Sequence, residues 1–238
     1  MFVPVHDINP LKRLPFQWVT VALIALNVLS YLLLSTEYFA PLYQYVAEFA
    51  LIPAEVLGPD QPLPSEVFQF YEPLPMPEEI TVLTYMFVHL GFLHLAGNMA
   101  FLWVFGDNVE DAMGHMRFLL FYLLCGVIAG LTHIVLEPDS HIPVVGASGA
   151  VGGIIGAYLM LHPNVKVWVL ALYRIPLRIT AAMAIGVWVA VQIYSAFFAE
   201  VNGVAWGAHL GGLAAGAVLI VIMRQPGVPL FDKTVSKV

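Results

Sequence analysis

Long apolar stretches separated by short polar segments dominate the chain. A helix needs about 20 mostly apolar residues to cross the roughly 30 Å hydrocarbon core of a bilayer. The pattern predicts six membrane-spanning helices at Phe16–Leu34, His89–Phe105, Phe118–Leu136, Ser148–Leu161, Leu177–Phe198 and Val204–Met223. The expected fold class is therefore all-α: a polytopic membrane protein with a six-helix bundle.

Composition supports this fold class. Of the 238 residues, 60% are apolar and 11% are charged, whereas about a quarter are charged in a typical soluble domain. The net charge of −7 argues against electrostatic binding of nucleic acid. A single cysteine, Cys125, excludes an intrachain disulfide and a thiolate metal cluster. We expect an N-terminal segment at 1–15, a membrane domain at 16–223 and a C-terminal tail at 224–238.

Basic residues give the expected orientation. The six-helix prediction places all nine on one side of the membrane, with Arg178 in the first turn of the span Leu177–Phe198: Lys12, Arg13, Arg117, Lys166, Arg174, Arg178, Arg224, Lys233 and Lys237. The positive-inside rule then predicts that both termini are cytoplasmic.

The loop 35–88 is expected to lie outside. It holds eight acidic residues, eight prolines and no basic residue. Its front half, Tyr38–Leu57, suits a short helix in the outer interface, and its back half, Gly58–Pro77, is expected to be irregular. A plain connector and a substrate-handling element remain equally open for this loop.

Ser148 is the first candidate for chemistry. Its span has 14 residues, which rise only about 21 Å at about 1.5 Å each. If the span ends at the inner interface, Ser148 lies roughly 9 Å below the outer surface, at a helix N-terminus with free backbone N–H groups. The alternative is that Ser148 is only an N-cap.

His209 lies at a matching depth, because it is five residues into the last span and so about 8 Å deep. Small residues let two helices approach closely. The glycines expected to allow this near the site are Gly146, Gly149, Gly152, Gly212 and Gly216. A histidine held beside a serine can take its proton and create a nucleophile. The alternative is that the glycines only pack helices and His209 bonds a backbone carbonyl.

His94 and Asn98 are four residues apart and share one helical face. Their side chains, with the Ser148 backbone N–H, could donate hydrogen bonds to a developing oxyanion. Hydrogen bonding between helices is the rival explanation. No carboxylate lies within a predicted span, so the simplest site is a Ser148–His209 dyad in which packing alone orients His209. His89 is expected to position a loop.

Metal binding is not expected. Among the histidines of the outer half, only His89 and His94 are close in sequence, and their spacing of five differs from the i, i+4 spacing of helical metal pairs. We expect no cofactor.

Three motifs resemble those of the rhomboid intramembrane serine proteases: HLGFLHLAGNM (His89–Met99), GASG (Gly146–Gly149) and AHLGGLAAG (Ala208–Gly216). The resemblance implies a six-helix core, Ser148 as nucleophile, His209 as general base, and an oxyanion hole of His94, Asn98 and Ser148. It implies cleavage of single-span or multi-span membrane proteins near the outer face of the lipid bilayer, without a cofactor.

The resemblance also implies a movable gate at Leu177–Phe198 and Ala199–Gly203, and the compact bacterial form of the family, in the inner membrane. Two features depart from the family pattern. Gly152 stands where many members have an aromatic residue against the histidine, and the first outer loop lacks a Trp-Arg pair.

Two other functions are alternatives to the protease. An inactive rhomboid-like factor that binds membrane proteins or serves their quality control would typically lack the serine or the histidine, and this chain has both. A transporter often shows inverted repeats, and we find none. The sequence makes no prediction of oligomeric state.

Overall fold

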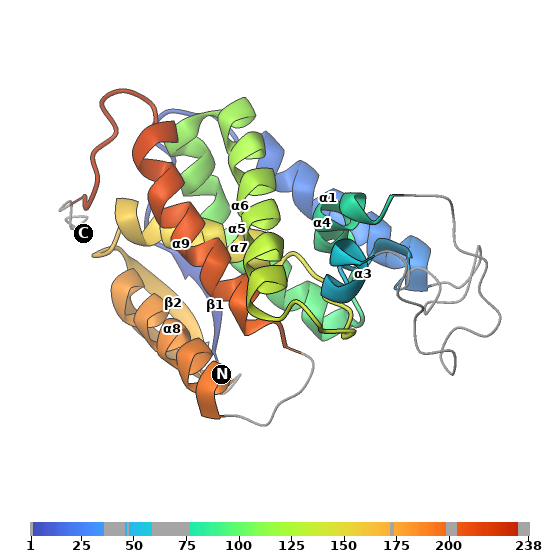
Figure 1. Ribbon diagram of the computed structural model, residues 1–238. Coiled ribbons are helices and arrows are strands. Elements are labelled where there is room, and N and C mark those ends of the chain that lie inside the picture. The colour runs from blue at the N-terminus through green and yellow to red at the C-terminus, as the bar shows by residue number, and fades with distance from the viewer. Residues whose placement is uncertain are drawn as a thin grey trace.

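The computed structural model describes residues 2–35, 46, 48–58, 77–171, 174–198 and 204–232. Helices form most of this part of the chain, and a small sheet lies at one edge (Figure 1). The long helices are α1 (Trp18–Ser35), α5 (Phe92–Met113), α6 (His115–Leu136), α7 (Ser148–Leu161), α8 (Ala181–Phe198) and α9 (Trp206–Met223). The bounds of α7 are those predicted from the sequence.

Other helix bounds differ from the prediction. α5 begins at Phe92 and continues eight residues past Phe105 to Met113, and α6 begins at His115 rather than Phe118. The predicted span Leu177–Phe198 is wrong at its start, because residues 177–180 are a strand. The last span begins at Trp206 rather than Val204.

The sheet was not predicted. It consists of β1 (Phe2–Asp7), β2 (Lys166–Ala171) and β3 (Ile175–Thr180), in the order β1-β2-β3, with both pairs antiparallel. Val3 pairs with Leu170, and Trp168 pairs with Arg178. Since β3 runs directly into α8, the sheet joins the N-terminal segment to the start of that helix (Figure 1).

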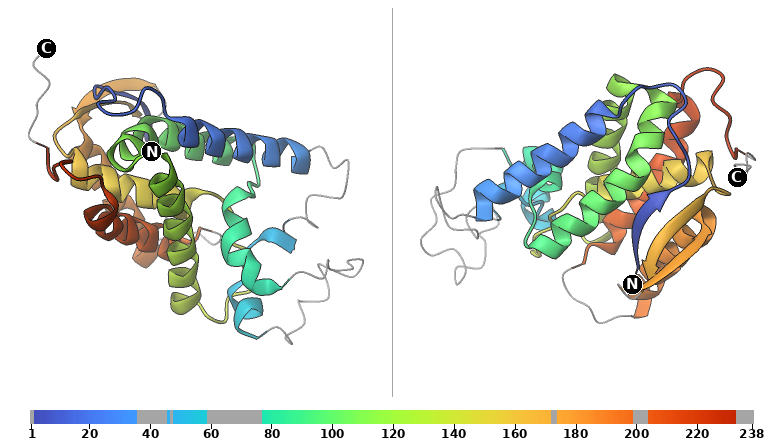
Figure 2. Two further views of the ribbon diagram at one scale, coloured as in Figure 1. Left: turned by 90° about the horizontal axis from the view of Figure 1, so that it is seen from above. Right: turned by 180° about the vertical axis from the view of Figure 1, so that it is seen from behind.

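α7 forms the centre of the bundle and packs against α9, α6 and α5 (Figure 2). Glycines on both helices bring α7 and α9 into backbone contact. A Cβ added at Gly212 would overlap the carbonyl oxygen of Gly149, and one added at Gly216 would overlap that of Gly153. α8 lies at the edge of the bundle, beside the sheet (Figure 1).

Part of the predicted loop 35–88 is helical. It contains α3 (Pro53–Leu57), η1 (Glu78–Ile80), α4 (Thr81–Thr84) and η2 (Tyr85–Phe87). Leu51 pairs with Val144 as an antiparallel bridge, and this contact ties the loop to the segment before α7. Residues 38–45 and 47 of the front half and nearly all of Gly58–Pro77 lie outside the described residues, as do 199–203 and 233–238.

Buried carboxylates explain why α5 continues past Phe105. Glu110 accepts hydrogen bonds from the backbone N–H groups of Val19 and Thr20, at 3.0 and 2.8 Å, and so caps the start of α1. Asp111 accepts from the backbone N–H groups at 12–14. These bonds offset the cost of burying the two carboxylates. The helix therefore continues through acidic residues that, in the sequence alone, indicate a loop after the apolar span.

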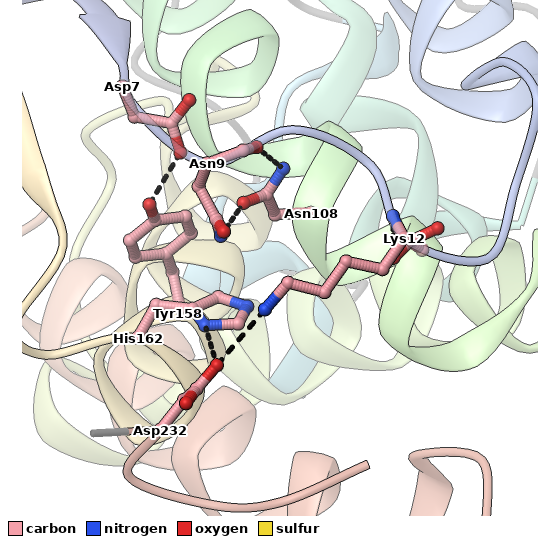
Figure 3. A network of polar contacts seen from close by, with 8 residues as sticks. Asp7, Asn9, Lys12, Asn108, Tyr158, His162 and Asp232 are labelled. Carbon is pink, nitrogen blue, oxygen red and sulfur yellow. Dashed lines mark hydrogen bonds and ion pairs between the residues drawn. The ribbon is translucent and has the colours of Figure 1, made fainter. Parts of the chain in front are cut away.

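A polar network joins the N-terminal segment, α5, the end of α7 and the C-terminal segment (Figure 3). Tyr158 donates a 2.5 Å hydrogen bond to Asp7, and Lys12 binds Asp232 at 3.0 Å. Burial raises the pKa of the Asp7 carboxyl to about 6. The backbone N–H of Asp232 also bonds the carbonyl of Leu161. The described part of the C-terminal segment therefore caps α7 at the end opposite to Ser148.

Within the described residues, α1, α6 and α9 are long and apolar enough to cross a membrane. The segments 78–87 and 92–113 qualify together as a fourth span, with a bend of 80° between them. α7 is shorter than this limit. The count of six spans therefore stays a prediction.

Candidate active site

Ser148 is the first residue of α7, and the preceding residue, Ala147, occupies the N-cap position. Ala147 makes no side-chain capping hydrogen bond, and because it occupies the N-cap position, the alternative that Ser148 is only an N-cap is wrong. Gly146 allows the turn before it, because its φ is +109°, a value that L side chains rarely adopt. The Ser148 side chain is half-buried and does not occupy the N-cap position.

His209 lies in the first turn of α9 and faces this serine. Its Nε2 is 2.8 Å from Ser148 Oγ, which is hydrogen-bond distance. Gly152 makes room for the approach, since a Cβ there would lie 3.0 Å from the carbonyl oxygen of His209. The structure thus brings together Ser148 and His209, which the sequence predicted to lie at the same depth in the membrane.

The other ring nitrogen of His209 contacts a residue that the sequence analysis missed. Nδ1 is 3.0 Å from Oε1 of Gln192, a buried side chain on α8. The rings of Trp188 and Trp206 lie near the imidazole, with centroids 6.1 and 5.9 Å away. The expectation that packing alone orients His209 is therefore wrong, because a side-chain hydrogen bond takes part.

His94 and Asn98 come from α5 and approach the turn before Ser148. A Cβ at Gly146 would lie 2.6 Å from the His94 ring and 3.5 Å from Asn98 Nδ2. His89 Nε2 lies 3.1 Å from the donor Nδ2 of Asn98, and His89 Nε2 also accepts a 3.4 Å hydrogen bond from the backbone N–H of Ala147. His89 therefore links α5 to this turn, as the sequence suggested.

The arrangement offers a hydroxyl, a base and nearby amide and imidazole donors. These are the groups that acyl transfer through a serine nucleophile requires. Among the described residues, no group of three or more His, Cys, Asp or Glu side chains could hold a metal ion. Cys125 is buried behind the site, against Gly153.

Comparison with known proteins decides the family. A family model described as the Rhomboid domain matches residues 77–226. The chain belongs to the Rhomboid family. Rhomboid members are typically intramembrane serine proteases, although some rhomboid-like members are inactive. With its long apolar helices, the chain is an integral membrane protein.

Several rhomboid relatives match more than half of this chain. Rhomboid protease GluP of Bacillus subtilis is 32% identical over 152 residues, which are 64% of this chain and 27% of that protein. RHOMBOID-like protein 5 of Arabidopsis thaliana is 30% identical over 63% of this chain and 46% of that protein. Rhomboid-like protein 11, chloroplastic, of the same plant is 30% identical over 65% of this chain and 56% of its own length. The chain thus spans less than two thirds of each of these relatives.

Proposed function

We propose that the chain is a serine-type intramembrane endopeptidase that hydrolyses peptide bonds of membrane-protein substrates near the outer membrane face. The observation that carries this proposal is the 2.8 Å contact between Ser148 Oγ and His209 Nε2, within a Rhomboid domain. In this role His209 takes the hydroxyl proton as Ser148 attacks the scissile carbonyl, and later returns a proton to the leaving amine.

Stabilisation of the tetrahedral intermediate is assigned to His94, Asn98 and the backbone N–H of Ser148. This N–H has no acceptor within its own helix, because it belongs to the first residue of α7. The approach of His94 and Asn98 to Gly146 supports their part in the oxyanion hole. The five glycines around the site, from Gly146 to Gly216, act by permitting the close packing.

The proposed topology has six spans, with segment 1–15 and tail 224–238 in the cytoplasm and a membrane domain at 16–223. The one-sided distribution of the nine basic residues supports it. A bacterial inner membrane is the proposed location. Under this topology the site lies in the outer half of the bilayer.

Reconstitution tests the function. Purified protein in liposomes is given a panel of single-span substrates, and cleavage by the wild type is compared with that by Ser148→Ala and His209→Ala. We expect cleavage by the wild type alone, and labelling of Ser148 by a fluorophosphonate that His209→Ala suppresses. Cleavage by folded Ser148→Ala at the wild-type rate would contradict the proposal. Substrate binding by the wild type without cleavage would favour the inactive, binding relative instead.

A further inference from the structure

We propose that Gln192 is a positioning residue that holds the His209 imidazole in the tautomer needed for catalysis. The inference rests on the proposed function and assigns a third side chain to the same site. Its starting point is the row of contacts from Gln192 Oε1 to His209 Nδ1 at 3.0 Å, and from His209 Nε2 to Ser148 Oγ at 2.8 Å.

The chemistry of the three groups determines which atom donates and which accepts in each of these two hydrogen bonds. A carbonyl oxygen only accepts hydrogen bonds, so the contact with Gln192 Oε1 requires the proton on Nδ1. A neutral imidazole carries one N–H, so Nε2 is then an acceptor. That nitrogen faces the Ser148 hydroxyl and can take its proton. The opposite tautomer would point an N–H at the hydroxyl and could not act as a base.

Burial gives the contact its strength. Gln192 is 5% exposed, and among the described side chains of α8, at 181–195, it is the buried polar one. The other buried residues there are Ala181, Ala184 and Ile185. A buried amide is costly without a partner, so the contact with His209 favours the observed position of both side chains.

The position of Gln192 on α8 has a consequence for control of the site. α8 lies at the edge of the bundle (Figure 1), whereas Ser148 and His209 lie on α7 and α9, which are in backbone contact through glycine. A shift of α8 by roughly 0.5 Å would stretch the 3.0 Å contact to the limit of a hydrogen bond. The tautomer of His209, and with it the ability of Nε2 to act as a base, therefore depends through Gln192 on the position of α8.

Three variants test the role in detergent-solubilised protein. Gln192→Leu removes the acceptor at similar volume. Gln192→Glu keeps acceptors at the same place and removes the amide donor. Ile185→Val is the matched control, since Ile185 is buried two turns earlier on α8. Circular dichroism and gel filtration confirm that each variant is folded.

The first readout is the ¹⁵N spectrum of histidine-labelled protein, with the His209 signals assigned from a His209→Asn sample. We expect the Nδ1–H tautomer in the wild type, in Gln192→Glu and in Ile185→Val, and a mixture of tautomers in Gln192→Leu. The second readout is the rate of fluorophosphonate labelling at Ser148. It should fall about tenfold in Gln192→Leu, the equivalent of about 1.4 kcal/mol, and stay within a few fold of the wild type in Gln192→Glu.

In substrate cleavage, Gln192→Leu should lower kcat and leave KM nearly unchanged. An unchanged tautomer and labelling rate in Gln192→Leu would overturn the proposal. Equal loss of labelling in the Leu and Glu variants with the wild-type tautomer would also overturn it, because Gln192 would then only pack α8. If the wild type cleaves no substrate, the proposed protease function fails, whereas the tautomer measurement still decides the role of Gln192.

Discussion

Gly146 is the position at which one added methyl group tests the geometry of the site most directly. In Gly146→Ala the new Cβ would lie 2.6 Å from Cε1 and Nε2 of His94. Carbon atoms in ordinary contact lie about 3.5–4.0 Å apart, so the ring has to retreat by roughly 1 Å. The φ of +109° adds backbone strain of about 1–3 kcal/mol for a residue other than glycine.

Gly97→Ala is the matched control. Gly97 lies on the same helix as His94 and Asn98, and a Cβ there would meet nothing within 4 Å. Alanine is favoured over glycine inside a helix by about 0.5–1 kcal/mol. We therefore expect Gly97→Ala to be as stable as the wild type or slightly more stable, with normal cleavage.

For Gly146→Ala we expect the free energy of unfolding to fall by about 1–3 kcal/mol. Turnover should fall much further than this loss of stability explains, since loss of one oxyanion donor costs about 10²–10³ in kcat. Thermal unfolding in detergent and initial cleavage rates in liposomes give the two quantities. If Gly146→Ala matches Gly97→Ala in both, the placement of His94 against this turn is refuted.

The other predictions concern the helix contact, the oxyanion hole and the polar network. Gly212→Ala should abolish fluorophosphonate labelling, because its Cβ would overlap the Gly149 carbonyl and force α9 away from α7, whereas Gly186→Ala, which meets nothing within 4 Å, should label normally. Asn98→Ala should lower kcat by up to about 10²–10³ with little change in KM; an effect on KM alone would count against the oxyanion role. Burial raises the pKa of Asp7 from 3.8 to about 6, so its protonated form stabilises the fold below pH 4, and this contribution is lost as the pH rises to about 6. Relative to Asp7→Asn, the wild type should lose up to about 3 kcal/mol of stability across this interval, and equal pH dependence of the two melting temperatures would contradict this.

The sequence predicted α7 and the pairing at its start because the signals there are local. Ser148–Leu161 is an unbroken apolar run that ends just before Pro163, and helical rise sets the depth of each residue in a span. Two residues at equal depth on glycine-rich helices then become neighbours. The 2.8 Å contact of Ser148 with His209 agrees with this reasoning.

The sheet and the end of α5 depend on partners far away in the sequence. Phe2–Asp7 pairs with a strand about 160 residues later, and nothing local in either segment specifies that pairing. Glu110 and Asp111 bond backbone groups 90 to 99 residues earlier. Read locally, acidic residues after an apolar run indicate that the helix has ended. Only the folded chain supplies the N–H groups that let the helix continue.

Gln192 differs from these cases, because the sequence did hold a signal for it. A polar side chain inside an apolar span is a functional candidate with a partner to be found. In the proposed orientation Phe198 is at the outer end of α8, and Gln192 is six residues before it, so helical rise places it about 9 Å deep. This is the depth calculated for Ser148 and His209. Depth alone could not say which face of α8 turns inward, and that face decides whether the amide meets the imidazole or the lipid. The buried positions 181, 184, 185 and 192 are spaced so that they lie on one face of the helix. This face packs inward, and Gln192 contacts His209 from it.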